Sequence, residues 1–176
     1  AALTGMVARL TIGKKKYAEF DAQMKDAAAR ADTLRSQLTQ SIDADSAAFE
    51  EVMAALKLPK ETAEQQAARQ QQIQITTQHA TAVPLAAAHA CLEILSLVHE
   101  VAAHGNVNAL SDAASAAFMA RAAIDAAGMN VRINAAALDD KAAANRSVEE
   151  LHSIQSQAAD RIKKILAEVE QRATLA

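Results

Sequence analysis

The chain contains very few aromatic residues: among its 176 residues there is no tryptophan, one tyrosine and three phenylalanines. Hydrophobic residues still make up 51% of it, and alanine is the commonest of them. Alanine and the long unbranched side chains favour helix, whereas the residues that favour strands are scarce. The composition therefore predicts an all-α, single-domain helical bundle with long helices, spanning residues 1–176. Because few large side chains are available to fill the core, we expect a homodimer.

Cysteine and positive charge are also in short supply. Cys91 is the single cysteine, which excludes a disulfide framework and a CxxC metal pair and fits a cytoplasmic protein. The net charge of −3 disfavours a nucleic-acid partner, since nucleic-acid binders normally carry a basic domain or face. Glu93 and Arg121 interrupt the most apolar stretches, so we expect no membrane-spanning run.

The chain has only four glycines and two prolines, the residues that most often mark helix ends and turns. Helix boundaries must therefore be predicted mainly from capping residues and from the spacing of hydrophobic residues. Thr62 and Gln65 form a capping-box pattern, Pro84 predicts a kink, and Gly13, Gly105 and Gly128 predict helix ends. We expect a segment to precede residue 1, because the chain starts with helical residues and no cap. The expected helices are 1–12, 17–40, 62–105, 112–127 and 147–176, with interruptions at 41–45 and 130–134, and a further helical pattern resumes at Phe49 and runs up to Pro59.

Familiar metal and nucleotide motifs are absent. His99 and His104 lie five residues apart rather than four, which turns the second imidazole away from the face of the first. The other histidines have no partner at metal-ligand spacing, so no metal site is expected. The glycines are too scattered to form a phosphate-binding loop.

Three consecutive lysines follow Gly13 in a chain that is acidic overall. Adjacent ammonium groups repel, and the repulsion is relieved either by bulk water or by an anion such as a phosphate or a polyglutamate tail. We favour an anion, because further polar residues occur at the other expected helix breaks. Each can be explained singly as a cap or a local hydrogen bond, but together they predict a ligand-binding cleft in the bundle. The candidate residues are Lys14, Lys15, Lys16, Tyr17, Asp43, Asp45, Asn106, Ser111, Asp112, Asn130 and Asn134.

The order and spacing of several short motifs extend over most of the chain. They are Leu10 to Tyr17 (Leu-Thr-Ile-Gly-Lys-Lys-Lys-Tyr), Asp45 to Phe49, Leu58 to Lys60, Val83 to Leu85, Gly105-Asn106, Ser111-Asp112, and Asn130 with Asn134. At these residues the chain resembles the cyclodeaminase/cyclohydrolase family of folate enzymes. That family includes the C-terminal domain of formiminotransferase-cyclodeaminase and stand-alone methenyltetrahydrofolate cyclohydrolases. A Pro-Gly-Gly-Gly-Ser-like segment of the family would lie before residue 1.

The resemblance implies hydrolysis of 5,10-methenyltetrahydrofolate to 10-formyltetrahydrofolate, with no metal or redox cofactor and with a folate, including its polyglutamylated forms, as substrate. It also allows formimidoyltetrahydrofolate cyclodeaminase activity, in which ring closure releases ammonia. A non-catalytic helical dimerisation scaffold is a third hypothesis, supported by the apolar seam from Phe20 to Leu38.

The resemblance also suggests roles for the candidate residues. Asp45 is our first choice for the chemistry, with Asp112 as the alternative and the other carboxylate recognising the pterin. The lysines would hold the glutamate tail, with Tyr17 and Ser111 also in contact with substrate. Neutral hydrogen bonds around the reacting carbon would come from Asn106, Asn130 and Asn134.

Overall fold

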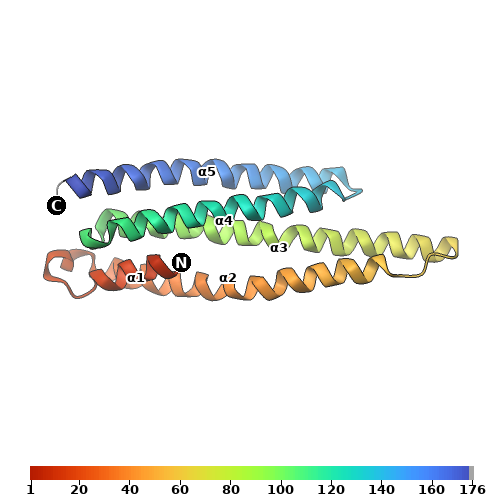
Figure 1. The fold of residues 1–176 in the computed structure, drawn as a ribbon, viewed down its shortest axis with the longest axis horizontal. Coiled ribbons are helices and arrows are strands. Elements are labelled where there is room, and N and C mark those ends of the chain that lie inside the picture. The colour runs from red at the N-terminus through yellow and green to blue at the C-terminus, as the bar shows by residue number, and fades with distance from the viewer. Residues whose placement is uncertain (175–176) are drawn as a thin grey trace.

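The computed structural model describes residues 1–174, which form an elongated all-α bundle with no strand among them (Figure 1). The prediction of an all-α bundle of long helices is therefore confirmed. The elements are α1 (Ala2–Thr11), the 3-10 helix η1 (Lys15–Phe20), α2 (Asp21–Leu56), α3 (Ala63–His104), the 3-10 helix η2 (Val107–Ala109), α4 (Leu110–Ala136) and α5 (Lys141–Thr174).

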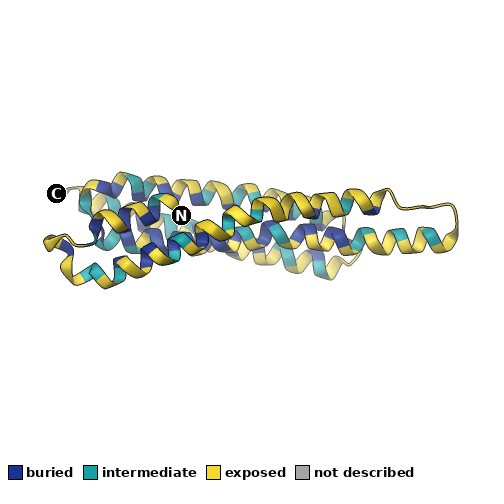
Figure 2. Cartoon of the chain, turned by 90° about the horizontal axis from the view of Figure 1, so that it is seen from below, coloured by how far each residue is buried: buried dark blue, intermediate teal, exposed yellow. Residues whose placement is uncertain are grey.

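Helix α3 organises the bundle, since α2, α4 and α5 all pack against it, and the short α1 lies against α2, α4 and α3. Buried residues follow the inner faces of the helices, whereas the far end of the α2–α3 hairpin is almost entirely exposed (Figure 2). Alanines on these inner faces let the helices approach closely. The larger side chains that are fully buried include Met24, Leu95, Leu97, Ile124, Leu151, Ile154 and Ile165.

The expected interruption at 41–45 is wrong, because α2 runs without a break from Asp21 to Leu56. Two serines at or next to the expected interruption bond back into their own helix. The hydroxyl of Ser41 donates to the carbonyl of Leu38 at 2.8 Å, and that of Ser46 donates to the carbonyl of Ile42 at 3.1 Å. Ser, Thr, Asn and Asp can be accommodated inside a helix in this way. Asp45 is consequently an exposed residue on a continuous helix.

The expected helix end at Gly128 is also wrong, since α4 continues to Ala136 and includes Asn130 and Asn134. Gly128 is buried where α5 crosses α4, and a Cβ at this position would lie 3.1 Å from Cδ1 of Leu151. The glycine therefore permits close helix packing rather than ending the helix. Helix α5 begins at Lys141 and not at Ser147, because Asp140 caps it by accepting a hydrogen bond from the Ala143 N–H at 3.0 Å.

Other local signals are confirmed. Gly13 adopts a φ of 76° just after α1 ends. Thr62 and Gln65 form both hydrogen bonds of the capping box at the start of α3, and Gly105 is the C-cap of the same helix.

The membrane expectation needs one correction. Helix α3 does contain an 18-residue window with a mean hydropathy of 1.7 and few charges, long and apolar enough to cross a bilayer despite Glu93. However, 61% of that window is buried inside the bundle. Because α3 packs against three other long helices, the apolar window is explained by its position in the core.

Candidate functional site

The three lysines line a cavity at the end of the bundle where α1 and α3 terminate. We call it the lysine cavity; it measures 500 Å³ and is lined by Lys14, Lys15, Lys16, Tyr17, Asn106, Val107 and Asn108. All three lysines are exposed, and none forms an ion pair among residues 1–174. The cavity thus presents three ammonium groups that have no carboxylate partner in the described part of the chain.

Hydrogen bonds between two loops hold the wall of the lysine cavity in place. The Asn106 N–H donates to the hydroxyl of Thr11 at 2.8 Å, and its side-chain amide donates to the carbonyl of Leu10 at 3.2 Å. The Val107 N–H donates to the phenol oxygen of Tyr17 at 3.1 Å, and this tyrosine is only 8% exposed. Tyr17 and Asn106 therefore join the two loops.

Two further contacts fix the same end of the bundle. The Gly13 N–H donates to the carboxylate of Asp21 at 2.7 Å, and Lys25 pairs with the other carboxylate oxygen at 2.6 Å. The hydrogen bond from Lys25, followed by that from Gly13, lowers the pKa of Asp21. From α5, Arg172 donates to the carbonyl of Ala102 and, at 2.7 Å, to that of Gly105.

A second cavity lies between α2 and α4, with α3 at its floor. This Asp45 cavity measures 420 Å³ and is lined by Asp45, Ser46, Phe49, Val52, Ala80, Asn130 and Asn134. Asn130 and Asn134 are one helical turn apart on α4, so both amides reach the cavity. The structure therefore brings together three predicted site residues, although they lie within helices rather than at helix breaks.

The remaining candidates do not join the Asp45 cavity. Ser111 and Asp112 lie in the first turn of α4, directly after η2, where the positive end of the helix dipole favours a carboxylate. Asp21 and Asp45 are separated by about 36 Å along α2, at 1.5 Å per residue. The sequence predicts a single cleft, but the structure has two separate cavities in one chain. The lysine cavity lies near Asp21, and the other cavity is lined by Asp45.

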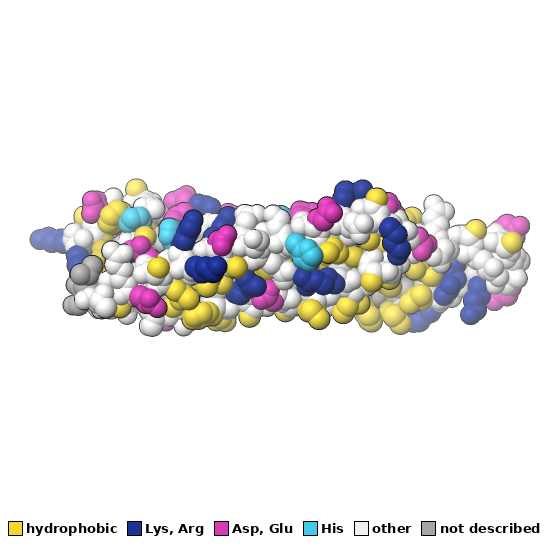
Figure 3. All heavy atoms as spheres, turned by 90° about the horizontal axis from the view of Figure 1, so that it is seen from above, with side chains coloured by type: hydrophobic (Ala, Val, Ile, Leu, Met, Phe, Trp, Pro, Cys, Tyr) yellow, Lys and Arg dark blue, Asp and Glu magenta, His cyan; other side chains and the backbone are white. Residues whose placement is uncertain are grey.

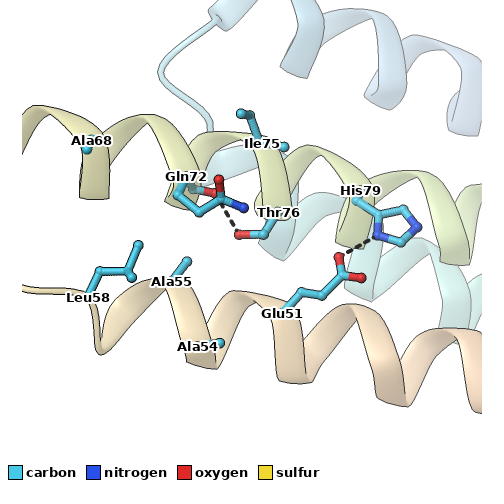
Figure 4. Close-up of a pocket in the computed structure, with 9 residues that line it drawn as sticks. All are labelled: Glu51, Ala54, Ala55, Leu58, Ala68, Gln72, Ile75, Thr76 and His79. Carbon is cyan, nitrogen blue, oxygen red and sulfur yellow. Dashed lines mark hydrogen bonds and ion pairs between the residues drawn. The ribbon is translucent and has the colours of Figure 1, made fainter.

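A third hollow was not predicted from the sequence. It is a groove of 780 Å³ between the outer parts of α2 and α3, shown in Figure 4, and it contains a hydrogen-bonded pair formed by Glu51 and His79. The Oε2 of Glu51 lies 2.9 Å from Nδ1 of His79. Val52 of the Asp45 cavity and Ala54 of this groove are two residues apart, so they project from roughly opposite sides of α2.

The histidines form no metal site in the part of the chain that the structure describes. No group of three or more His, Cys, Asp or Glu side chains lies close enough to hold a metal ion within residues 1–174. His104 instead stacks on Phe20, with ring centroids 4.3 Å apart, and His89 bonds to Glu150 at 2.6 Å.

One face of the bundle exposes many large apolar side chains. Figure 3 shows hydrophobic side chains gathered along one edge for most of the length of the molecule. Most of the exposed large apolar residues belong to α1, α2 and α4, and a cavity of 170 Å³ between the first four α-helices is lined by apolar residues and Cys91. The most exposed of these residues are Ile42, Met119, Phe49, Ile133, Met129 and Phe118, with between 66% and 54% of their surface accessible. Large contiguous apolar patches on a protein mark interaction surfaces.

Two kinds of curated relative match almost the whole chain. A methenyltetrahydrofolate cyclohydrolase from Methylorubrum extorquens is 44% identical over 158 residues, which cover 90% of this chain and 76% of that protein. Formimidoyltransferase-cyclodeaminases from Rattus norvegicus and Sus scrofa are 30% and 32% identical, over 98% and 99% of this chain. The aligned region spans only 32% and 30% of those two proteins.

A solved structure and a family model agree with these relatives. The crystal structure of a formiminotetrahydrofolate cyclodeaminase from Thermotoga maritima matches the fold with a TM-score of 0.87 at 26% sequence identity, covering 97% of this chain and 81% of that one. The family model described as formiminotransferase-cyclodeaminase matches residues 1–153. The resemblance found in the sequence motifs is thus confirmed, and the chain belongs to the formiminotransferase-cyclodeaminase family.

Proposed function

We propose that this protein is a methenyltetrahydrofolate cyclohydrolase, which hydrolyses 5,10-methenyltetrahydrofolate to 10-formyltetrahydrofolate. The observation that carries the proposal is the 44% identity to the Methylorubrum extorquens cyclohydrolase, over most of both chains. The relatives with cyclodeaminase in their names are 30–33% identical, and the Thermotoga maritima cyclodeaminase is 26% identical. The competing activity is ring closure of formimidoyltetrahydrofolate with release of ammonia. The close structural match to the Thermotoga maritima cyclodeaminase favours this second activity.

The Asp45 cavity contains the kinds of group that the hydrolysis requires. A water molecule adds to the cationic methenyl carbon and passes one proton to a carboxylate, for which we propose Asp45, giving a neutral carbinolamine. The bond from this carbon to N5 then breaks, N5 takes the proton from Asp45, and the hydroxyl proton leaves to solvent as the formyl carbonyl forms. The sum is one water consumed and one proton released. Because no atom changes oxidation state overall, we propose that no redox cofactor takes part.

The lysine cavity suits the other end of the substrate. A polyglutamate tail carries one free carboxylate per added residue, and three adjacent unpaired ammonium groups match such a series of charges. In a folate the one-carbon centre and the glutamates lie at opposite sides of the aminobenzoyl ring. Asp45 shares its cavity with the side-chain amides of Asn130 and Asn134, whereas Asp112 does not line that cavity, and this favours Asp45 over Asp112 for the chemistry.

The distance between the two cavities supports a homodimer. Asp21, which bonds Gly13 beside the lysine cavity, lies about 36 Å from Asp45 along α2, and a folate with a single glutamate is too short to bridge that span within one chain. We propose that a second copy covers the exposed apolar face of α1, α2 and α4 in a two-fold arrangement. If the two bundles run antiparallel, the lysine end of one protomer approaches the Asp45 cavity of its partner, and one substrate can contact both.

The deciding experiment supplies purified protein with each substrate separately. Methenyltetrahydrofolate absorbance is followed as it falls through hydrolysis or rises through ring closure, and ammonia is assayed alongside. We expect hydrolysis well above the uncatalysed rate and no ammonia from formimidoyltetrahydrofolate. Rapid ammonia release with background hydrolysis would reverse the assignment. Absence of both reactions, together with no rise in melting temperature at saturating folinic acid, would favour the scaffold.

A further inference from the structure

Pro84 leaves a backbone carbonyl without its usual partner in the middle of α3. In an α-helix the N–H of residue 84 would donate to the carbonyl of Ala80, but proline has no N–H, and its ring crowds that carbonyl. Helix α3 nevertheless continues through this point. Ala80 and Pro84 are both buried, and a buried carbonyl oxygen that accepts no hydrogen bond lowers the stability of the fold. The carbonyl of Ala80 therefore needs a donor from another element.

Asn134 of α4 supplies this donor. Its Nδ2 lies 2.7 Å from the carbonyl oxygen of Ala80. Only one orientation of the amide is compatible with this contact, because the reverse orientation would place two acceptor oxygens against each other. The contact therefore fixes the nitrogen on Ala80 and turns Oδ1 of Asn134 away from that carbonyl. No donor among residues 1–174 bonds to this Oδ1, and both Ala80 and Asn134 line the Asp45 cavity.

We infer that Pro84 is a positioning residue for the reaction, acting through Ala80 and Asn134. It frees the carbonyl that holds Asn134, and Oδ1 of Asn134 then serves the Asp45 cavity as an acceptor of fixed orientation. This inference rests on the proposed hydrolysis and adds a role within it. A water molecule has two protons to donate: one goes to the carboxylate of Asp45 and the other to Oδ1 of Asn134, which directs a lone pair at the methenyl carbon. A freely rotating amide would present its NH₂ group half of the time and hold the water less well.

Replacing Pro84→Ala restores the missing N–H and gives the Ala80 carbonyl a donor within its own helix. The helix remains intact, since alanine is the best helix former. Asn134 must then compete with this N–H for the carbonyl, which weakens its anchor, and we expect kcat to fall about tenfold, the effect of one weakened hydrogen bond in the transition state, with KM little changed. Pro59→Ala is the matched control, because this second proline lies in the exposed loop between α2 and α3. It should leave kcat unchanged.

The anchor itself can be observed without any activity. The chain has five asparagines, so selective ¹⁵N-asparagine labelling gives five side-chain NH₂ pairs, and Asn134→Ala identifies the pair of Asn134 by its disappearance. In the original protein one proton of this pair should be shifted downfield and protected from exchange. Pro84→Ala should move it to the position of a solvent-exposed amide, and Pro59→Ala should not.

A double-variant cycle separates positioning from a general structural effect. In the Asn134→Ala background, Pro84→Ala should have no further effect on kcat, because the side chain through which Pro84 acts is already absent. An unchanged Asn134 signal in Pro84→Ala, an unchanged kcat, or an equal loss of kcat in both backgrounds would each overturn the inference. If the original protein fails to hydrolyse methenyltetrahydrofolate, the proposed function fails, whereas the NMR result still decides whether Pro84 orients Asn134.

Discussion

Replacing Gly128→Ala should destabilise the protein even though alanine is the better helix former. The propensity gain within α4 is about 1 kcal/mol. Against it, the new Cβ would lie 3.1 Å from Cδ1 of Leu151 and 3.2 Å from Nε2 of Gln155. Leu151 is fully buried, and Gln155 is held by Asp125 and Arg132 through hydrogen bonds of 3.0 and 2.7 Å, so neither can move aside freely. Overpacking costs typically about 1–3 kcal/mol, which leaves a net loss of about 1 kcal/mol.

The assay for Gly128→Ala is urea unfolding followed by circular dichroism, at one protein concentration for all variants. Ala126→Gly, at an exposed position of the same helix, calibrates the propensity and should cost about 1 kcal/mol. In a Leu151→Ala background the crowding is relieved, and Gly128→Ala should become less costly or stabilising. A higher unfolding free energy for Gly128→Ala alone would refute the view that Gly128 is required for the close approach of α5.

Three further predictions concern the proposed function. Asp45→Asn keeps the shape of the side chain but removes the base, so turnover should fall roughly 10²–10⁴-fold without loss of folding; equal turnover would transfer the role to Asp112. Changing the lysines at 14–16 together to glutamine should raise KM for polyglutamylated substrate about tenfold, because each exposed ion pair contributes about 0–1 kcal/mol. The same change should raise KM for monoglutamyl substrate less. Light scattering should give about twice the chain mass of 18.5 kDa, and a stable monomer at micromolar concentration would contradict the proposed dimer.

Local signals in the sequence predicted part of the fold correctly. The capping box of Thr62 and Gln65 and the turn at Gly13 depend on residues close in sequence, so both could be read directly. Gly128 resembles a helix end in the sequence, but the need for glycine at this position comes from α5, where Leu151 occupies the space that a side chain would take. Similarly, Ser41 resembles a cap in sequence but bonds to its own helix in the structure.

The candidate site was partly predictable for a different reason. The sequence pattern predicts Asp45, Asn130 and Asn134 at helix breaks, yet all three lie inside helices and meet because α2 and α4 flank α3. The pair formed by Glu51 and His79 gave no signal, since 28 residues separate the two across the α2–α3 hairpin. Contacts of this kind depend on the helix register, which the spacing of alanines does not specify.

The projecting α2–α3 hairpin has a consequence for the motions of the molecule. Beyond Ala55 of α2 and before Thr76 of α3 no residue is buried, and in Figure 1 this end of the hairpin extends past α4 and α5. Segments with few buried contacts open at a lower free energy than the core and exchange their amide hydrogens faster. Exchange along α3 should therefore slow progressively from Gln65 towards Leu95. Residues 45–52 of α2 form one wall of the Asp45 cavity and include Ala48 as their one buried residue, so within a single protomer this wall is held less firmly than the core around Leu95.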